Sequence, residues 1–158
     1  MNGASCKAWI LPLAGGRHAA VGEQEMVHII PEWVRLQPIP RCPAHCHRVF
    51  VWQGQLVPVF DLHAFIFRRD AATVDNSPDA APIISIVAYT DADDTVCLGG
   101  LLAGAIPFRT VVVDDQFCDF PDGADRWSKI AASCFTDPAA GPTPVLDLPR
   151  IFCSPPGA

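Results

Sequence analysis

The sequence predicts an all-β fold built from many short strands, of the kind found in barrels and sandwiches. Short apolar runs rich in Val, Ile and Phe recur along the chain, and turn residues separate them. Sixteen prolines and eleven glycines among 158 residues indicate frequent turns and few long elements. Half of the residues are hydrophobic and 18% are charged, so the chain can fill the core of one domain.

The strongest local pattern is a β-hairpin at residues 48–67. Val49–Trp52 is a β-branched and aromatic run, residues 53–55 form a turn containing Gly54, and Leu56–Leu62 is a second apolar run. Pro58 donates no backbone hydrogen bond, which predicts an edge strand or a bulge there. We expect the Asp61 carboxylate to accept N–H groups of the following turn, where residues 63–67 form a helical turn or the end of the strand.

The other expected elements follow in chain order. Apolar runs predict strands at 7–13, 18–21, 26–30, 82–89, 96–106, 108–113 and 145–152. The acidic residues 90–95 resemble a solvated hairpin tip, and the glycines at 99, 100 and 104 favour either bending of strands or their close approach. Trp127, Ile130, Ala131 and Cys134 recur at helical spacing, which predicts a short helix within 125–135.

The chain divides into two halves at a polar segment. Residues 69–81 are small and polar and are typical of a linker. The text V-x-D-L occurs near the end of each half, at Val59–Leu62 and at Val145–Leu148. This placement favours two similar small barrels. We expect one barrel at about 7–68 and the other at about 82–152.

Composition and motifs exclude several classes of function. The net charge is −6 and no basic stripe is present, so a nucleic-acid partner is not expected. No apolar run approaches the roughly 20 residues that span a bilayer, and the first residues lack a signal-peptide pattern, so we expect a cytoplasmic protein without membrane insertion. Ser85, Ser128 and Ser133 lie in no nucleophile motif, and no acid and base are paired by spacing. A non-catalytic binding module without a cofactor is therefore predicted.

A cluster of soft ligands offers an alternative function. Cys42 and Cys46 are four residues apart, and His45 and His47 flank the second cysteine. On a helix, residues at this spacing share a face and could converge on zinc or copper. The paired C-x2-C motifs of zinc knuckles are absent. The segment therefore allows two interpretations, a metal- or redox-responsive site or a connector whose cysteines are buried.

The hairpin text resembles the CheW-like coupling domain of bacterial chemotaxis arrays. Val49, Gly54, Val57, Pro58, Val59, Asp61 and Leu62 match the family pattern G-V-x-N-L-R-G-x-I-V-P-V-x-D-L. The resemblance runs from about Ala20 to Phe152 and implies a single CheW-like domain over 1–158. It implies two packed five-stranded SH3-like β-barrels with one or two short helices. It also implies an adaptor that couples the cytoplasmic tip of methyl-accepting chemoreceptors to the regulatory domain of a CheA-like histidine kinase, associated with membranes only through receptor arrays.

The chain departs from the family at a charged pair. The family arginine falls on Gln53 and the family glutamate on Ile29, so both charges are lost together and no unpaired charge remains. The resemblance then places the protein-binding surface near Val27, Ile29, Val49, Gln53, Gly54, Val57 and Pro58. The apolar character of this surface indicates a divergent member. One candidate role is an adaptor of a type IV pilus (twitching motility) chemosensory system.

Overall fold

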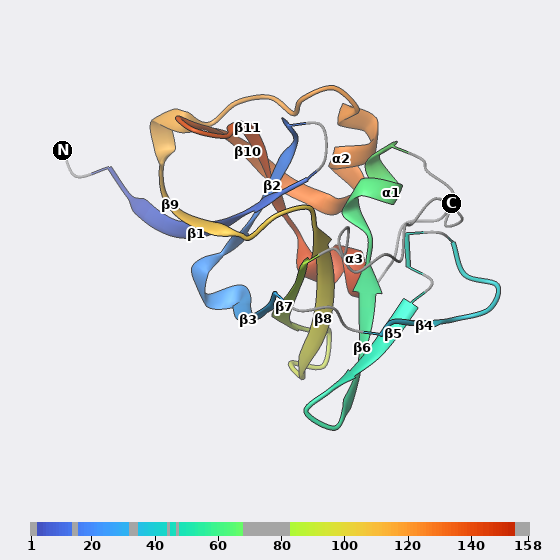
Figure 1. The fold of residues 1–158 in the computed structure, drawn as a ribbon. Coiled ribbons are helices and arrows are strands. Elements are labelled where there is room, and N and C mark those ends of the chain that lie inside the picture. Colours follow the sequence, from blue (N-terminus) through green and yellow to red (C-terminus); the bar gives the residue numbers. More distant parts are fainter. Residues whose placement is uncertain are drawn as a thin grey trace.

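Two curled β-sheets lie side by side, with short helices near their junction (Figure 1). The structure is a computed structural model, and it describes residues 3–13, 16–31, 35–43, 45–46, 48–67 and 83–153. The strands are β1 (Ser5–Pro12), β2 (His18–Gly22), β3 (Met26–Ile30), β4 (Gln37–Pro38), β5 (Arg48–Trp52), β6 (Gln55–Phe60), β7 (Ile83–Thr90), β8 (Val96–Ala103), β9 (Phe108–Val113), β10 (Ala131–Asp137) and β11 (Gly141–Leu146). The helices are α1 (Leu62–Phe67), α2 (Ala124–Ile130) and α3 (Leu148–Phe152), with 3-10 turns η2 (Glu23–Glu25) and η5 (Asp114–Gln116).

The first sheet has five strands in the order β10-β11-β2-β1-β9. Its two outer strands, β9 and β10, approach each other. The Thr110 hydroxyl on β9 donates a 2.6 Å hydrogen bond to the Asp137 carboxylate on β10. A β-bridge between Phe117 and Phe135 continues this contact beyond the end of β9. The five strands therefore curl into a small barrel, which confirms the predicted fold class.

The second sheet has six strands in the order β3-β7-β8-β6-β5-β4, of which β4 has only two residues. It curls so that β3 approaches β5, and the rings of His28 and Trp52 stack with centroids 5.9 Å apart. Both sheets contain strands from both sides of residues 69–81, so the bounds 7–68 and 82–152 do not coincide with the two sheets. The expected linker at 69–81 lies outside the described residues.

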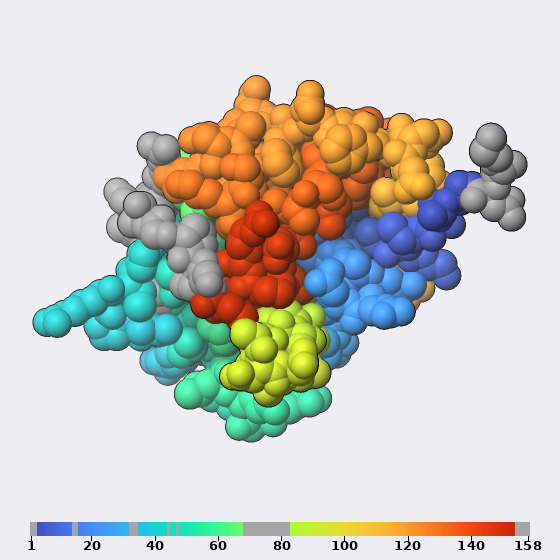
Figure 2. Space-filling view, turned by 180° about the vertical axis from the view of Figure 1, so that it is seen from behind, coloured from blue at the N-terminus to red at the C-terminus, as the bar shows by residue number. Residues whose placement is uncertain are grey.

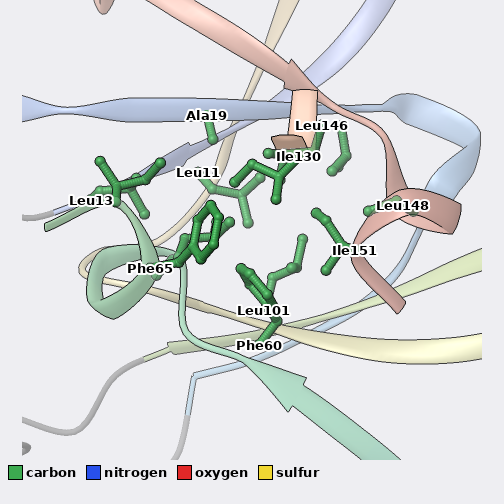
Figure 3. Packing of buried hydrophobic residues seen from close by; sticks show 14 of the residues in the cluster. Leu11, Leu13, Ala19, Phe60, Phe65, Leu101, Ile130, Leu146, Leu148 and Ile151 are labelled. Atoms are coloured by element: carbon green, nitrogen blue, oxygen red, sulfur yellow. The ribbon is translucent and has the colours of Figure 1, made fainter. Parts of the chain in front are cut away.

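The largest core cluster lies between the two sheets rather than inside either one (Figure 3). Strand β1 buries Ile10 inside the five-stranded barrel and Leu11 in the core between the sheets. Strand β7 likewise buries Ile86 inside the six-stranded barrel and Val87 in the shared core. Strands buried on both faces have nearly continuous apolar sequences, which explains the runs in these two segments.

The repeated V-x-D-L text marks two equivalent helix starts. The Asp61 carboxylate accepts the Ala64 N–H at 3.0 Å at the start of α1, as expected from the sequence. The Asp147 carboxylate accepts the Arg150 N–H at 3.2 Å at the start of α3. Each strand thus ends at an aspartate that caps a short helix. Helix α3 (red in Figure 2) lies between α2 and the β7–β8 hairpin.

The helix predicted within 125–135 is shorter than expected. Helix α2 ends at Ile130, and Ala131 and Cys134 belong to strand β10. Trp127 and Ile130 are fully buried in the core between the sheets, as their spacing predicted. Among the described residues, no helix is long and apolar enough to cross a membrane.

Candidate protein-interaction surface

The β5–β6 hairpin projects from the six-stranded sheet and ends in a tight two-residue turn (Figure 1). Gln53 has φ of 48° and Gly54 has φ of 78°, so both central residues are left-handed. This is the backbone of a type I′ turn, whose twist matches that of the strands it joins. The turn fixes the register, in which Trp52 is opposite Gln55 and Val51 is opposite Leu56.

The register gives the hairpin two different faces. Phe50 and Val57 form an opposed pair that is buried inside the six-stranded barrel. Alternation places Val49, Val51, Leu56 and Pro58 on the opposite side, and we call these four residues the hairpin face. Val51 is 66% exposed and Leu56 is 72% exposed. The hairpin face is therefore apolar, uncharged and open to a partner.

Strand β3 extends the same region at the other end of the sheet. Val27 is 45% exposed and Ile29 is half-buried. His28 lies between them and stacks on Trp52 of β5 with an interplanar angle of 29°. The two stacked residues are the sequence neighbours of Ile29 and Gln53. Their stacking connects β3 to the hairpin through an aromatic contact.

The structure thus divides the seven predicted binding residues into two surface groups and one buried residue. Val49, Gln53, Gly54 and Pro58 lie on the hairpin surface, and Val27 and Ile29 lie on β3. Val57 is fully buried and supports the hairpin from inside, so it cannot touch a partner directly. Sequence reasoning missed Val51 and Leu56, the large exposed aliphatic residues of the hairpin face. Alternation counted outward from a buried Val57 would have identified Leu56.

Pro58 is accommodated without the predicted edge strand or bulge. Strand β6 lies between β5 and β8, and its residues pair with β5 in continuous register. Its parallel pairing with β8 begins only after Pro58, at Val59 opposite Gly100. Pro58 therefore lies in the part of the inner strand β6 that comes before its pairing with β8.

The Cys/His segment has a structural role at His45. The imidazole is 6% exposed and packs on the rings of Phe60 and Phe65, with centroids 5.4 and 5.0 Å away. Cys42 is exposed, whereas burial, with a further contribution from Cys42, raises the pKa of the Cys46 thiol. A raised pKa disfavours the thiolate that binds metals. His47 lies outside the described residues, and no three His, Cys, Asp or Glu side chains among those described are arranged to hold a metal ion.

Comparison with known proteins places this architecture in a family. A family model of the CheW-like domain matches residues 11–98, more than half of the chain. The crystal structure of the scaffolding protein TtCheW from Thermoanaerobacter tengcongensis is similar in fold, with a TM-score of 0.71 and 15% sequence identity. The similarity covers 94% of this chain and 93% of that chain. No curated protein matches the sequence. The matched model and the shared fold together show that the chain belongs to the CheW-like domain family.

Proposed function

We propose that this protein is a non-catalytic adaptor that couples chemoreceptors to a chemosensory histidine kinase. The observation that carries the proposal is the hairpin face, an exposed apolar surface in a member of the CheW-like family. Exposed apolar patches on a folded domain commonly mark protein interfaces, and partner docking would remove Val51 and Leu56 from water. The partners proposed are the kinase regulatory domain and the cytoplasmic tip of a methyl-accepting receptor.

Two positions next to the hairpin face and on β3 support a further proposal about the pathway. The resemblance places Gln53 where typical family members carry an arginine and Ile29 where they carry a glutamate. A neutral surface would select a partner by apolar contact rather than by charge. We therefore favour an auxiliary chemosensory pathway, such as the one that controls type IV pili and twitching motility.

A bridging experiment tests the coupling role. The protein is mixed with a kinase regulatory domain and a receptor cytoplasmic fragment from the same organism, and complexes are measured by analytical ultracentrifugation. We expect a ternary species that contains all three components and that is absent when this protein is omitted. Sedimentation of this protein alone, with neither component bound, would contradict the adaptor role while leaving the family assignment intact.

A further inference from the structure

Two cysteines that are distant in sequence face each other across a pair of extended segments. Cys118 follows η5, and Cys134 lies in β10. The β-bridge between Phe117 and Phe135 places Cys118 and Cys134 at the next opposed position, and the Cys118 N–H donates to the Cys134 carbonyl at 3.0 Å. This single backbone hydrogen bond holds the two residues side by side on neighbouring segments.

The side chains of Cys118 and Cys134 also lie close together. The two sulfur atoms are 3.5 Å apart, in contact but not bonded. Small rotations about the Cα–Cβ bonds would bring them to the bonding distance of about 2.05 Å. The pair is therefore poised for closure, with its two sulfur atoms already in contact.

The two thiols differ in access to solvent. Cys134 is 2% exposed, whereas Cys118 is partly exposed. Burial, assisted by the neighbouring Cys118, raises the pKa of Cys134 to about 12. A small reagent in solution therefore reaches Cys118 first, and Cys134 is placed to react only with a group already on Cys118.

We propose that Cys118 and Cys134 form a reversible intramolecular disulfide by exchange with a small disulfide such as oxidised glutathione. The Cys118 thiolate attacks one glutathione sulfur, which forms a mixed disulfide and releases one glutathione thiolate. The Cys134 thiolate then attacks the Cys118 sulfur and releases the second glutathione thiolate. The two cysteines lose two protons and two electrons, and oxidised glutathione takes them up to become two thiols.

The disulfide would fix one wall of a surface groove. Phe117 precedes Cys118, is 71% exposed and lines a groove of about 340 Å³ with Val112, Phe135 and Val145. These neighbours belong to the interior of the five-stranded barrel, so the groove opens at the end of that barrel. In the reduced protein, backbone hydrogen bonds hold the Phe117 segment on β10. In the oxidised protein a covalent bond would also hold it.

Peptide mapping tests the proposal directly, because trypsin separates the two cysteines. Cleavage after Arg109, Arg126, Lys129 and Arg150 leaves Cys118 alone in peptide 110–126 and Cys134 alone in peptide 130–150. The native protein is incubated with oxidised glutathione, alkylated and digested without reductant. We expect mass spectrometry to find these two peptides linked, and dithiothreitol to release them. The same treatment in denaturant should instead give a mixture of cysteine pairs.

Thermal unfolding of variants provides the second readout. Closing a loop of this length should raise Tm by about 5–10 °C in the oxidised wild-type protein. The rise should be absent in Cys118→Ser and retained in the control Cys153→Ser, which alters an exposed cysteine outside the pair. Peptide 110–126 recovered only as a glutathione adduct or unmodified, or a predominant link between Cys97 and Cys153, would overturn the proposal.

Discussion

The ring of Phe152 packs directly against the backbone of Gly99. A Cβ atom at position 99 would overlap three ring carbons of this phenylalanine. Tyr89 also contacts Phe152, and the two rings stack with centroids 5.2 Å apart. The glycine in β8 therefore allows helix α3 to pack closely on the six-stranded sheet, whereas the sequence suggested that the glycines let strands bend or approach each other.

This contact predicts that Gly99→Ala is destabilising. The added methyl group must displace Phe152 or shift β8, and such overpacking commonly lowers the free energy of unfolding by about 1–3 kcal/mol. Urea denaturation measures the change. In the double variant Gly99→Ala, Phe152→Leu, the smaller side chain relieves the overlap, so the two effects should not add. Full stability in Gly99→Ala alone would contradict the packing described here.

The hairpin turn makes a second prediction. Gly54→Ala places a side chain at a φ of 78°, so we expect a loss of roughly 1–2 kcal/mol in the free energy of unfolding. Gln53→Asn should retain stability, because asparagine tolerates the left-handed region better than glutamine. Gly3→Ala is the control, since no atom lies within 4 Å of its new methyl group. Equal stability of Gly54→Ala and Gly3→Ala would argue against the type I′ turn.

The lowered pKa of Asp137 predicts that the five-stranded barrel loses stability when this carboxylate is protonated at low pH. Burial acts to raise its pKa, but the Thr110 hydroxyl and the N–H groups of Ala140 and Ala139 donate to the carboxylate, and the net effect lowers the pKa below 3.8. The unfolded chain therefore takes up the proton more readily than the folded protein. The stabilisation by Asp137 is present above about pH 4 and is lost as the pH falls through the lowered value.

Measurement of stability against pH tests this assignment. Asp137→Asn should lower the free energy of unfolding at pH 7 by roughly 1–3 kcal/mol, because it weakens hydrogen bonds to a buried charged group. Its stability should then fall less steeply than that of wild type as the pH drops below 4. The control Asp93→Asn changes an exposed carboxylate and should follow the wild-type curve. Parallel acid limbs for Asp137→Asn and wild type would contradict the prediction.

The packing of the Cys/His segment predicts that Cys42 and Cys46 do not hold a zinc ion. Because the His45 ring packs between Phe60 and Phe65, we expect Cys42→Ala combined with Cys46→Ala to leave zinc binding unchanged. Zinc content is measured after incubation with the metal and gel filtration of both proteins. Stoichiometric zinc that is present in wild type and lost in the double variant would revive the sensor interpretation.

Local patterns were sufficient to predict the hairpin, and they offered the helix that Asp61 caps as one of two alternatives. The alternation around Phe50, the left-handed turn at Gly54 and the capping Asp61 all act within a few residues of one another. The long apolar runs of β1, β7 and β8 were also recognisable, since both of their faces are buried. These features determined the fold class and the family resemblance before any tertiary contact was known.

The features that sequence reasoning missed depend on contacts between residues that are far apart in the sequence. Nothing near Val145 indicates its parallel pairing with Ala20, and nothing near Val59 indicates Gly100. These pairings assemble each sheet from both halves of the chain. Cys134 fits a helical period, yet its segment is a strand because β11 pairs with it. The burial of Val57, and hence the exposure of Leu56, depends on the curl of the sheet over Ile30 and Ile84.

The most direct test of the adaptor account is calorimetric titration of the protein with the regulatory domain of a chemosensory kinase from the same organism. We predict a Kd on the order of micromolar, with little dependence on salt because the hairpin face is uncharged. Leu56→Asp should weaken binding at least about tenfold. Ile106→Asp, at a comparably exposed apolar residue between β8 and β9, should bind like wild type. Equal affinity in both variants, or steep weakening of wild-type binding by salt, would contradict docking through the hairpin face.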